Sequence, residues 1–489
     1  MLLVESPRRP PVAAAAVIGA TLFVLTACVI AGRGMRLIAP AALGLVIAIV
    51  VLPRLLSWRA QLATIVVVIL FIPMKYYGLP ASLPIRLEPY RLLVAAVLVV
   101  WLTSTLIDRR IRLRRTHVID LPLAGFLCAI LVSEAMNRAR FSSVETDVIK
   151  ELLFFASIIA VFFMVLSLVR TFADVDFIVR VLTGSGAVVA FFALIEAKTG
   201  YNVFHHLSHI FPFLRATGGG SEITRGGHLR VYASAEHPIA LSALFAMLVP
   251  FALYRAICFK QARWWAAAGV LLLATFATGS RTGIVMLLVV ALVYLWLRGP
   301  EMKRLWPLLI PMLLAIHIAL PGALGSFRES FFPANGIIAQ QTDQAVGSGR
   351  IATFWPAIHK EFTPHPFFGE GFGTRITTPD PAVPVPNAPI LDDQWLGTLL
   401  ETGLFGALCL AWLFIRFVRK LGKKARHDRS PRGWILAAAA AAVAAYAESM
   451  LTYDALGFTQ ETFILFLIIA LGCVTYRLPA NAIATDGGS

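Results

Sequence analysis

Charged residues are scarce in this sequence. Only 14% of the 489 residues are Asp, Glu, Lys or Arg, whereas 58% are hydrophobic. A soluble domain carries about 25% charged residues, and a soluble chain of this length could not enclose so much apolar surface in its core. The composition therefore excludes an ordinary soluble enzyme and indicates that lipid surrounds most of the chain.

Cysteines and recognisable cofactor motifs are also few. The five cysteines stand singly within or beside apolar segments, which predicts small core residues rather than disulfides or metal ligands. No Walker loop, GxSxG elbow or haem motif is present, and the histidines of residues 199–235 lack the spacing of a zinc site. We therefore expect neither a metal nor a cofactor.

The chain has an excess of positive charge, with a formal net charge of +16. Such an excess is compatible with nucleic-acid binding. However, the Lys and Arg residues lie mostly in short loops beside apolar segments, as the positive-inside rule of membrane proteins expects. The pattern predicts a membrane protein with no nucleic-acid partner.

Long apolar runs recur along the whole sequence. About fourteen are long enough, or nearly so, to cross a bilayer, and unpaired backbone groups in lipid leave the helix as their structure. We read the first, residues 12–31, as a span rather than a cleaved signal peptide. The sequence predicts an all-α polytopic membrane protein with spans centred near residues 21, 45, 67, 98, 128, 160, 187, 246, 272, 290, 313, 404, 443 and 469.

Two strongly basic loops, residues 108–115 and 416–432, predict the orientation. Both should face the cytoplasm, which places both termini there as well. Residues 1–198 are then N-terminal transmembrane helices, residues 199–476 form a core, and residues 477–489 form a cytoplasmic tail. The segments predicted to lie outside are 75–89, 136–150, 199–235 and the single large extracytoplasmic loop 322–392, and the turn 279–283 opens to the same side.

Arginines on the predicted outer side are unexpected under the positive-inside rule. Arginine stays charged and makes paired hydrogen bonds to two phosphate oxygens. Arg281 is the sharpest case, because it lies in a short turn between two apolar helices, where an ionisable residue needs a partner. Binding of lipid headgroups, or pairing with nearby glutamates such as Glu236, remains an alternative. The outer arginines are Arg215, Arg225, Arg230, Arg281, Arg328, Arg350 and Arg375.

The long loop contains further candidate residues. A stretch around Trp355 predicts an amphipathic helix, and His365-Pro366 predicts a turn or a helix start. Asp392 and Asp393 precede an apolar helix that contains Glu401. One aspartate can cap this helix, which leaves the other to contact a sugar hydroxyl or accept its proton. Capping alone is an equally open interpretation.

These stretches together resemble the O-antigen ligase and Wzy-type polysaccharide polymerase superfamily. The resemblance rests on Arg230 through Glu236-His237-Pro238, on Gly279 to Gly283, on Ser348-Gly349-Arg350 with Trp355, and on His365 to Gly371 followed by Asp392 to Gly406. It covers about residues 230–406 in the order and spacing of that family.

The resemblance implies a metal-independent glycosyltransferase of the GT-C type. Its donor would be a glycan on undecaprenyl diphosphate, and its site would face the periplasm at the inner membrane. Arg230, Arg281, Arg350 and Asp392 would be catalytic. The residues expected to bind substrate are Arg225, Trp355, His365, Asp393 and Glu401.

The family's ligases typically carry His-Asn where this chain has Asp392-Asp393, and this departure favours the polymerase branch. A polymerase would act on membrane-bound donor and acceptor glycans, beside a flippase and a chain-length regulator. A ligase remains the alternative enzyme. A transporter is less favoured, because few charged residues lie within the apolar runs.

Overall fold

The computed structural model describes residues 57–79, 88–107, 115–216, 224–225, 228–320, 350–377 and 386–479, together with the single positions 325 and 331. The predicted spans centred near residues 21 and 45 lie outside these ranges. So do most of residues 322–349 and residues 378–385 of the predicted loop 322–392, nearly all of the basic loop 108–115, and the chain's last ten residues.

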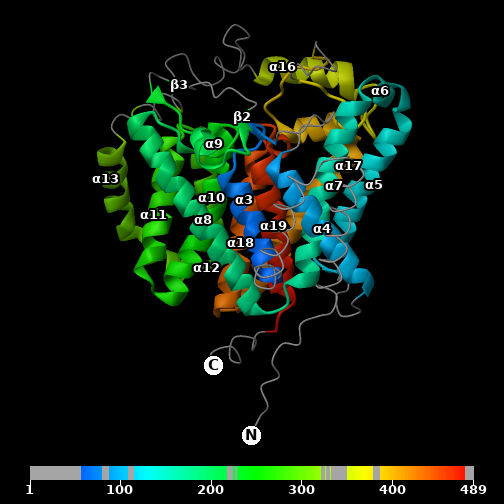
Figure 1. Cartoon of the computed structure of the whole chain (residues 1–489). Helices are drawn as coiled ribbons and strands as arrows, with labels where there is room; N and C mark the ends of the chain where they lie inside the picture. Colours follow the sequence, from blue (N-terminus) through cyan, green and yellow to red (C-terminus); the bar gives the residue numbers. More distant parts are fainter. Residues whose placement is uncertain are drawn as a thin grey trace, which may run out of the picture.

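The described chain is a bundle of apolar helices (Figure 1). Each predicted span centre from residue 67 onward falls within a separate helix. The helices are α3 Trp58–Phe71, α4 Pro89–Ile107, α5 Asp120–Met136, α7 Glu145–Leu168, α8 Phe172–Thr199, α10 Pro238–Phe259, α11 Ala262–Ala277, α12 Arg281–Lys303, α13 Leu309–Ala319, α17 Gln394–His427, α18 Pro431–Ser449 and α19 Thr459–Arg477. Seven of the described helices are long and apolar enough to cross a membrane, while α3, α11 and the segment Trp306–Ala319 are shorter apolar helices. The total of fourteen spans stays a prediction.

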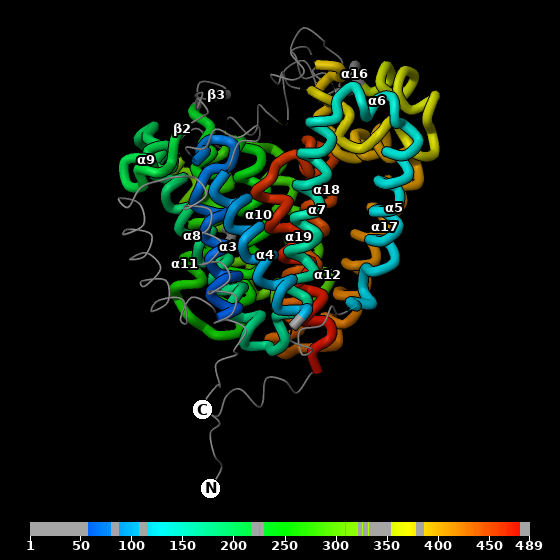
Figure 2. Tube along the Cα trace, turned by 45° about the vertical axis from the view of Figure 1, so that its right-hand side comes forward, coloured from blue at the N-terminus to red at the C-terminus, as the bar shows by residue number. Residues whose placement is uncertain are grey.

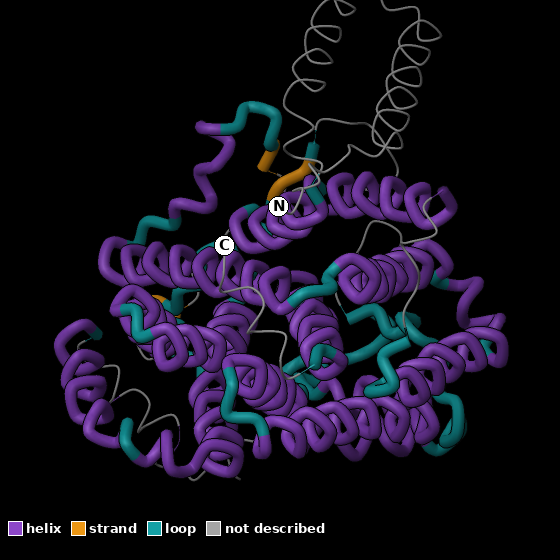
Figure 3. The backbone as a smooth tube through the Cα atoms, turned by 90° about the horizontal axis from the view of Figure 1, so that it is seen from below, coloured by secondary structure: helices purple, strands orange, loops and turns teal. Residues whose placement is uncertain are grey.

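Helices α10 and α19 form the centre of the bundle. In the most apolar part of α19, 94% of the residues are buried, and in α10 83%, against 28% in α4. Seen from below, the described chain is a bundle of helices packed side by side (Figure 3). Helices with low burial, such as α4, present apolar side chains outward, as a lipid solvent requires.

Short elements gather at one end of the bundle, which we call the loop end (Figures 1 and 2). They are α6 Arg138–Ser143, η1 Val203–His206, α9 Leu207–Ile210, α16 Arg350–Ala357 with the helical turn Ile358–Phe362, strand β1 Tyr77–Gly78 paired with β2 Arg215–Ala216, and β3 Thr224–Arg225 paired with β4 His228–Leu229. They belong to the four segments predicted to share one side of the membrane. Their described parts do lie together, while the side that they face stays a prediction.

Helix α17 breaks at Gly403. The sequence predicts one span centred near residue 404, but the backbone of Gly403 leaves the helix with φ 68° and ψ −172°, a conformation open essentially only to glycine. With 34 residues, an unbroken α17 would measure about 51 Å, well beyond the roughly 30 Å of a bilayer's hydrocarbon core. The break separates a short segment at the loop end from the apolar length of the helix.

The backbone groups released at this break bind the stretch that follows His365. The amides of Glu370 and Gly371 donate to the carbonyls of Leu400 and Glu401, at 2.9 and 3.2 Å. In return, the amides of residues 404 and 405 donate to the carbonyls of residues 366 and 367, at 2.9 and 3.2 Å. We call this exchange the 366–405 clamp, and it satisfies backbone groups that a helix break otherwise leaves unpaired.

The end of α5 holds the clamp from the other side. The Ser133 hydroxyl donates to the carbonyl of Glu401 at 2.6 Å, and the Asn137 side-chain amide donates to the carbonyl of Gly369 at 2.9 Å. A side chain on Gly369 or Gly403 would collide with the facing backbone. The glycines of the His365 and Glu401 motifs are therefore required by close backbone approach.

Replacing Gly403 with Ala should destabilise the loop end. An added Cβ would lie 2.3 Å from the carbonyl carbon of Phe367, and φ is positive. We expect a loss of roughly 2–4 kcal/mol, seen as a lower apparent melting temperature in detergent and as protease cleavage near residue 370. Gly184→Ala is the matched control, because its Cβ meets nothing within 4 Å. Equal melting temperatures for the two variants would contradict this account of the clamp.

Candidate functional site

A polar cavity of about 420 Å³ opens at the loop end. Its size is within the range of small-molecule sites. Cations, carboxyl groups and aromatic rings all line it. Ionisable residues gathered in this way in a membrane protein mark a candidate functional site. The charged and aromatic lining residues are Lys75, Arg91, Lys150 and Arg375, Asp147, Glu151, Glu401 and Asp454, and Tyr90, Phe154 and Phe372.

Segments far apart in the sequence build this cavity. The starts of α4 and α7 form one wall, and the stretch Phe372–Thr377 forms the next. The first turns of α17 and the connection between α18 and α19, residues 450–458, complete it. The sequence assigned the N-terminal helices no part in the site, yet residues 75–154 supply much of the lining.

The start of α17 separates the roles of the two aspartates. Asp393 is the N-cap of the helix, and its carboxylate accepts from the amide of Leu396 at 3.0 Å. Asp392 precedes the cap with a φ of 51°, in the left-handed region, and its carboxylate does not cap the helix. Capping therefore accounts for Asp393 and leaves Asp392 as the spare carboxylate, as one of the two sequence interpretations requires.

Gln394 fastens the start of α17 to the 450–458 connection. Its backbone amide donates to the carbonyl of Met450 at 2.8 Å, and its side-chain oxygen accepts from the amide of Leu456 at 2.8 Å. These bonds bring Asp454 to the cavity beside the aspartate pair. Burial raises the pKa of Asp454 above its ordinary value, and the Asp392 carboxylate adds to the rise while Arg375 opposes it.

Asp454 was missed at the level of sequence because it is a lone aspartate in a short connection without a motif. One signal could have found it. The connection between the last two apolar runs falls on the same predicted side as the segment 322–392. Lys75 and Glu151 could be found in the same way, since the outer segments 75–89 and 136–150 adjoin or contain them.

Each cation of the cavity already has a carboxylate partner. Lys75 pairs with Glu236 at 2.7 Å, and the Lys75 amine also donates to the carbonyl of Gly457. The other three pairs are Arg91 with Glu88 at 3.3 Å, Lys150 with Asp147 at 2.8 Å, and Arg375 with Glu361 at 2.7 Å. The predicted alternative partner Glu236 is therefore bound to a lysine.

Burial opposes the charged form of Lys75, yet its pKa is raised because the coulombic attraction of Glu236 and other carboxylates outweighs that effect. The pair with Glu236 thus favours the charged form of Lys75.

Arg230 packs on the turn that leads into Arg281, residues 278–281, which we call the arginine turn. Arg230 is only 8% exposed, its Nε donates to the carbonyl of Thr278 at 3.1 Å, and its side chain packs on Gly279, where φ is 61°. Arg281 is the first residue of α12, two positions further along. The structure therefore brings two of the predicted catalytic arginines to one turn, beside the N-terminus of α12, where the helix dipole favours anions.

The arginine turn is connected to the cavity through the 450–458 connection. The hydroxyls of Thr282 and Thr452 are hydrogen-bonded at 2.8 Å, and Thr452 lies two residues before Asp454. His237 caps α10 beside this turn, with Nδ1 accepting from the amide of Ile239 at 3.2 Å. Burial and the charge of Arg230 lower the pKa of His237 to about 4, so the ring is neutral at physiological pH.

The remaining predicted residues lie at the loop end in different settings. Trp355, on the expected helix α16, is 59% exposed and stacks on His359, and His365 is an exposed turn residue whose carbonyl accepts from the amide of Gly369. Neither lines the cavity, in contrast to Glu401. Arg350 begins α16 and Arg225 lies in β3, but their side chains are outside the described part of the structure.

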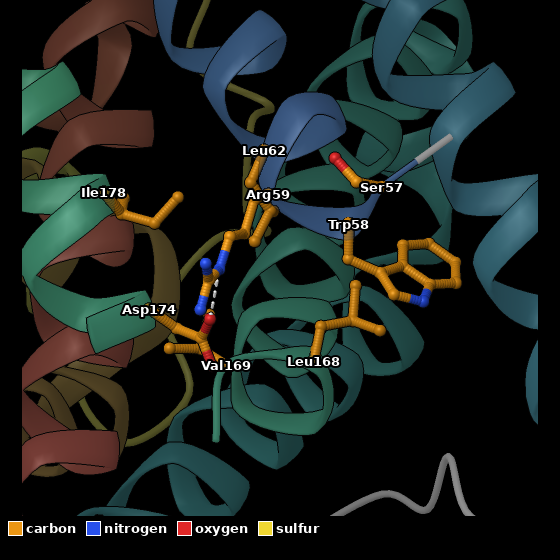
Figure 4. A pocket seen from close by; sticks show the side chains of 8 residues that line it. All are labelled: Ser57, Trp58, Arg59, Leu62, Leu168, Val169, Asp174 and Ile178. Carbon is orange, nitrogen blue, oxygen red and sulfur yellow. Dashed lines mark hydrogen bonds and ion pairs between the residues drawn. The ribbon is translucent and has the colours of Figure 1, made fainter. Parts of the chain in front are cut away.

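A second cavity, of about 340 Å³, lies at the opposite end of the bundle between α3, the end of α7 and α8 (Figure 4). Arg59 and Asp174 point toward one another there and form an ion pair at 2.5 Å. Asp174 also completes a capping box with Thr171 at the start of α8. Most other lining residues are apolar, so this ion pair has a structural explanation.

The fold and the cavity define a polytopic helical membrane protein with a polar site at one end of the bundle. Residues 266–411 match the family model Wzy_C, described as O-antigen ligase, and no curated protein matches the chain. Members of this family are membrane enzymes of the glycosyltransferase type, both ligases and polymerases, and their substrates are lipid-linked glycans.

The match bears out the resemblance seen in the sequence. It runs from α11 into α17 and contains Arg281, Asp392 and Glu401, whereas Arg230 and Asp454 lie outside the matched segment. In the described residues, no group of three or more His, Cys, Asp or Glu side chains is arranged to hold a metal ion.

Replacing Asp454 with Asn should stabilise the protein more strongly as the pH rises. The Asp454 carboxyl group has a raised pKa in the folded protein, so it binds its proton more tightly when folded. The wild type therefore loses stability as the pH rises from the pKa of Asp in the unfolded chain, near 3.9, through the higher pKa of folded Asp454. The variant lacks this loss. We expect similar melting temperatures near pH 4 and a higher one for Asp454→Asn at pH 8, measured in detergent. A difference that does not grow with pH would contradict the assignment.

Proposed function

We propose that the protein is a membrane glycosyltransferase that polymerises undecaprenyl-diphosphate-linked repeat units into exopolysaccharide or O-antigen. The reaction takes place at the outer face of the inner membrane, with both termini in the cytoplasm, and needs no metal. The observation that carries the proposal is the position of the arginine turn beside a polar cavity, partly within a segment that matches the O-antigen ligase family.

In this proposal the donor's diphosphate binds at the arginine turn. Arg281 is the first residue of α12, and Arg230 packs on the turn that precedes it, so positive charge lies at the helix end that favours anions. As the glycosidic carbon is released, negative charge grows on the diphosphate. Preorganised arginines stabilise that charge most effectively in a site from which water is excluded. We assign the same role to Arg350 and a weaker one to Arg225, by family match and by position respectively.

The acceptor glycan occupies the cavity on the other side of the 450–458 connection. A hydroxyl oxygen of its terminal sugar attacks the anomeric carbon of the donor, the bond from that carbon to the diphosphate oxygen breaks, and the diphosphate leaves with the electron pair. Asp454 accepts the hydroxyl proton. A base with a raised pKa suits this task. Asp392, whose charge acts on Asp454, tunes or replaces it in that role.

The described part of the long loop, residues 350–377, contributes to glycan binding in this scheme. Trp355 and His365 are exposed on its described part and are the side chains that contact the growing chain. Asp393 and Glu401 support the acceptor from the start of α17. A flippase that delivers the donor and a chain-length regulator are the partner proteins that such a reaction requires.

Reconstitution in liposomes with purified lipid-linked repeat units tests the function. A polymerase yields a ladder of products and free undecaprenyl diphosphate, and Asp454→Asn yields neither, while Asp174→Asn at the far end keeps the ladder. Transfer to a single lipid or protein acceptor without a ladder would instead establish a ligase. Movement of the intact donor across the bilayer, with no release of diphosphate, would sink the proposal and favour a transporter.

Arg281→Lys separates a phosphate clamp from a mere positive charge. Lysine keeps the charge but loses the planar fork of hydrogen-bond donors, so we expect turnover to fall by roughly 100-fold with normal membrane insertion. Arg263→Lys is the matched control, because Arg263 binds Gln261 at the opposite end of α11. Activity within about twofold of the wild type for Arg281→Lys would remove the clamp role.

A further inference from the structure

The carboxyl groups in and around the cavity outnumber the cations that line it. Each of the four lining cations binds a carboxylate. The pairs are Lys75–Glu236, Arg91–Glu88, Lys150–Asp147 and Arg375–Glu361. An anionic ligand that reached one of these cations would lie beside the carboxylate that the cation already binds, and the two negative charges would repel each other.

Three further carboxyl groups line the same cavity. None of the ion pairs among the described residues includes Glu151, Glu401 or Asp454. In their ionised form they repel an anion, and in their protonated form they offer it no positive charge. In both forms they bind hydroxyl groups, since a carboxylate is a strong acceptor and a carboxylic acid both donates and accepts.

The rings of Tyr90, Phe154 and Phe372 complete the lining. Aromatic faces carry partial negative charge and pack against the C–H groups of a sugar ring. The cavity therefore combines hydroxyl-binding groups with apolar faces. Such a lining is complementary to an uncharged sugar, which has hydroxyl groups at its edge and C–H groups on its faces.

We propose that this cavity binds an uncharged sugar residue of the acceptor glycan and rejects sugars that carry a carboxylate, phosphate or sulfate. The inference rests on the proposed function, because it treats the cavity as the acceptor side. In this proposal the 450–458 connection separates the binding site of the diphosphate from the binding site of the acceptor sugar. The anionic diphosphate is favoured at the arginine turn and disfavoured in the cavity, so the two ends of a lipid-linked glycan cannot exchange places.

Binding of matched trisaccharides to the full chain in nanodiscs tests the proposal. The panel contains neutral trisaccharides of glucose, galactose, mannose and N-acetylglucosamine, each with a counterpart oxidised to the uronic acid at its non-reducing end. Saturation-transfer NMR reports the affinity of each member. We expect at least one neutral trisaccharide to bind, and its oxidised counterpart to bind roughly tenfold more weakly or worse.

Glu151→Gln, which keeps the shape of the side chain, should narrow the difference between the neutral and oxidised partners by several-fold, and Asp454→Asn is the second variant should the first fail to fold. Asp174→Asn at the far cavity should leave the ratio unchanged. Equal or tighter binding of the oxidised sugars, an unchanged ratio in the cavity variants, or no binding of any panel member would each overturn the inference. Failure of the proposed function is a separate result, namely the absence of transfer from lipid-linked donor.

Discussion

The 366–405 clamp is the constraint on which the site depends. Because Gly403 leaves the helical conformation, carbonyls of α17 become free to bind the amides that follow His365, and the returning bonds fix the stretch that leads to Arg375. Backbone hydrogen bonds of this kind depend on close approach rather than on side-chain identity, which is why glycines occupy both sides of the contact. The clamp holds one wall of the cavity at a set distance from the membrane-spanning part of α17.

The 450–458 connection divides the site into two environments. On one side, its Thr452 bonds to Thr282 beside the arginine turn, and on the other, Asp454 lines the cavity. The first environment gathers positive charge at a helix N-terminus, whereas the second is neutral or acidic once its ion pairs are counted. In the proposed reaction, a sugar hydroxyl attacks a carbon whose leaving group is an anionic diphosphate. This reaction needs two separate environments, because the hydroxyl and the diphosphate must each be held without competing for the other's site.

The sequence could predict what depends on local pattern. Apolar runs determine where helices lie, and the helices confirm those positions from residue 67 onward. The capping role of one aspartate before α17 and the starting position of Arg281 also follow from short motifs. The cavity could not be predicted, since Glu151 and Asp454 meet only when helices about 300 residues apart pack together. The break at Gly403 was missed because an apolar run indicates a span without revealing a backbone turn within it.

The central claim is that the donor's diphosphate binds at the arginine turn and not in the cavity. An electron cryomicroscopy structure of the full chain in nanodiscs with undecaprenyl diphosphate tests it most directly. The account predicts density for the two phosphates in contact with the guanidinium groups of Arg230 and Arg281, beside the start of α12, with the cavity free of phosphate. Phosphate density in the cavity against Lys75 or Arg375, with none at the arginine turn, would contradict it.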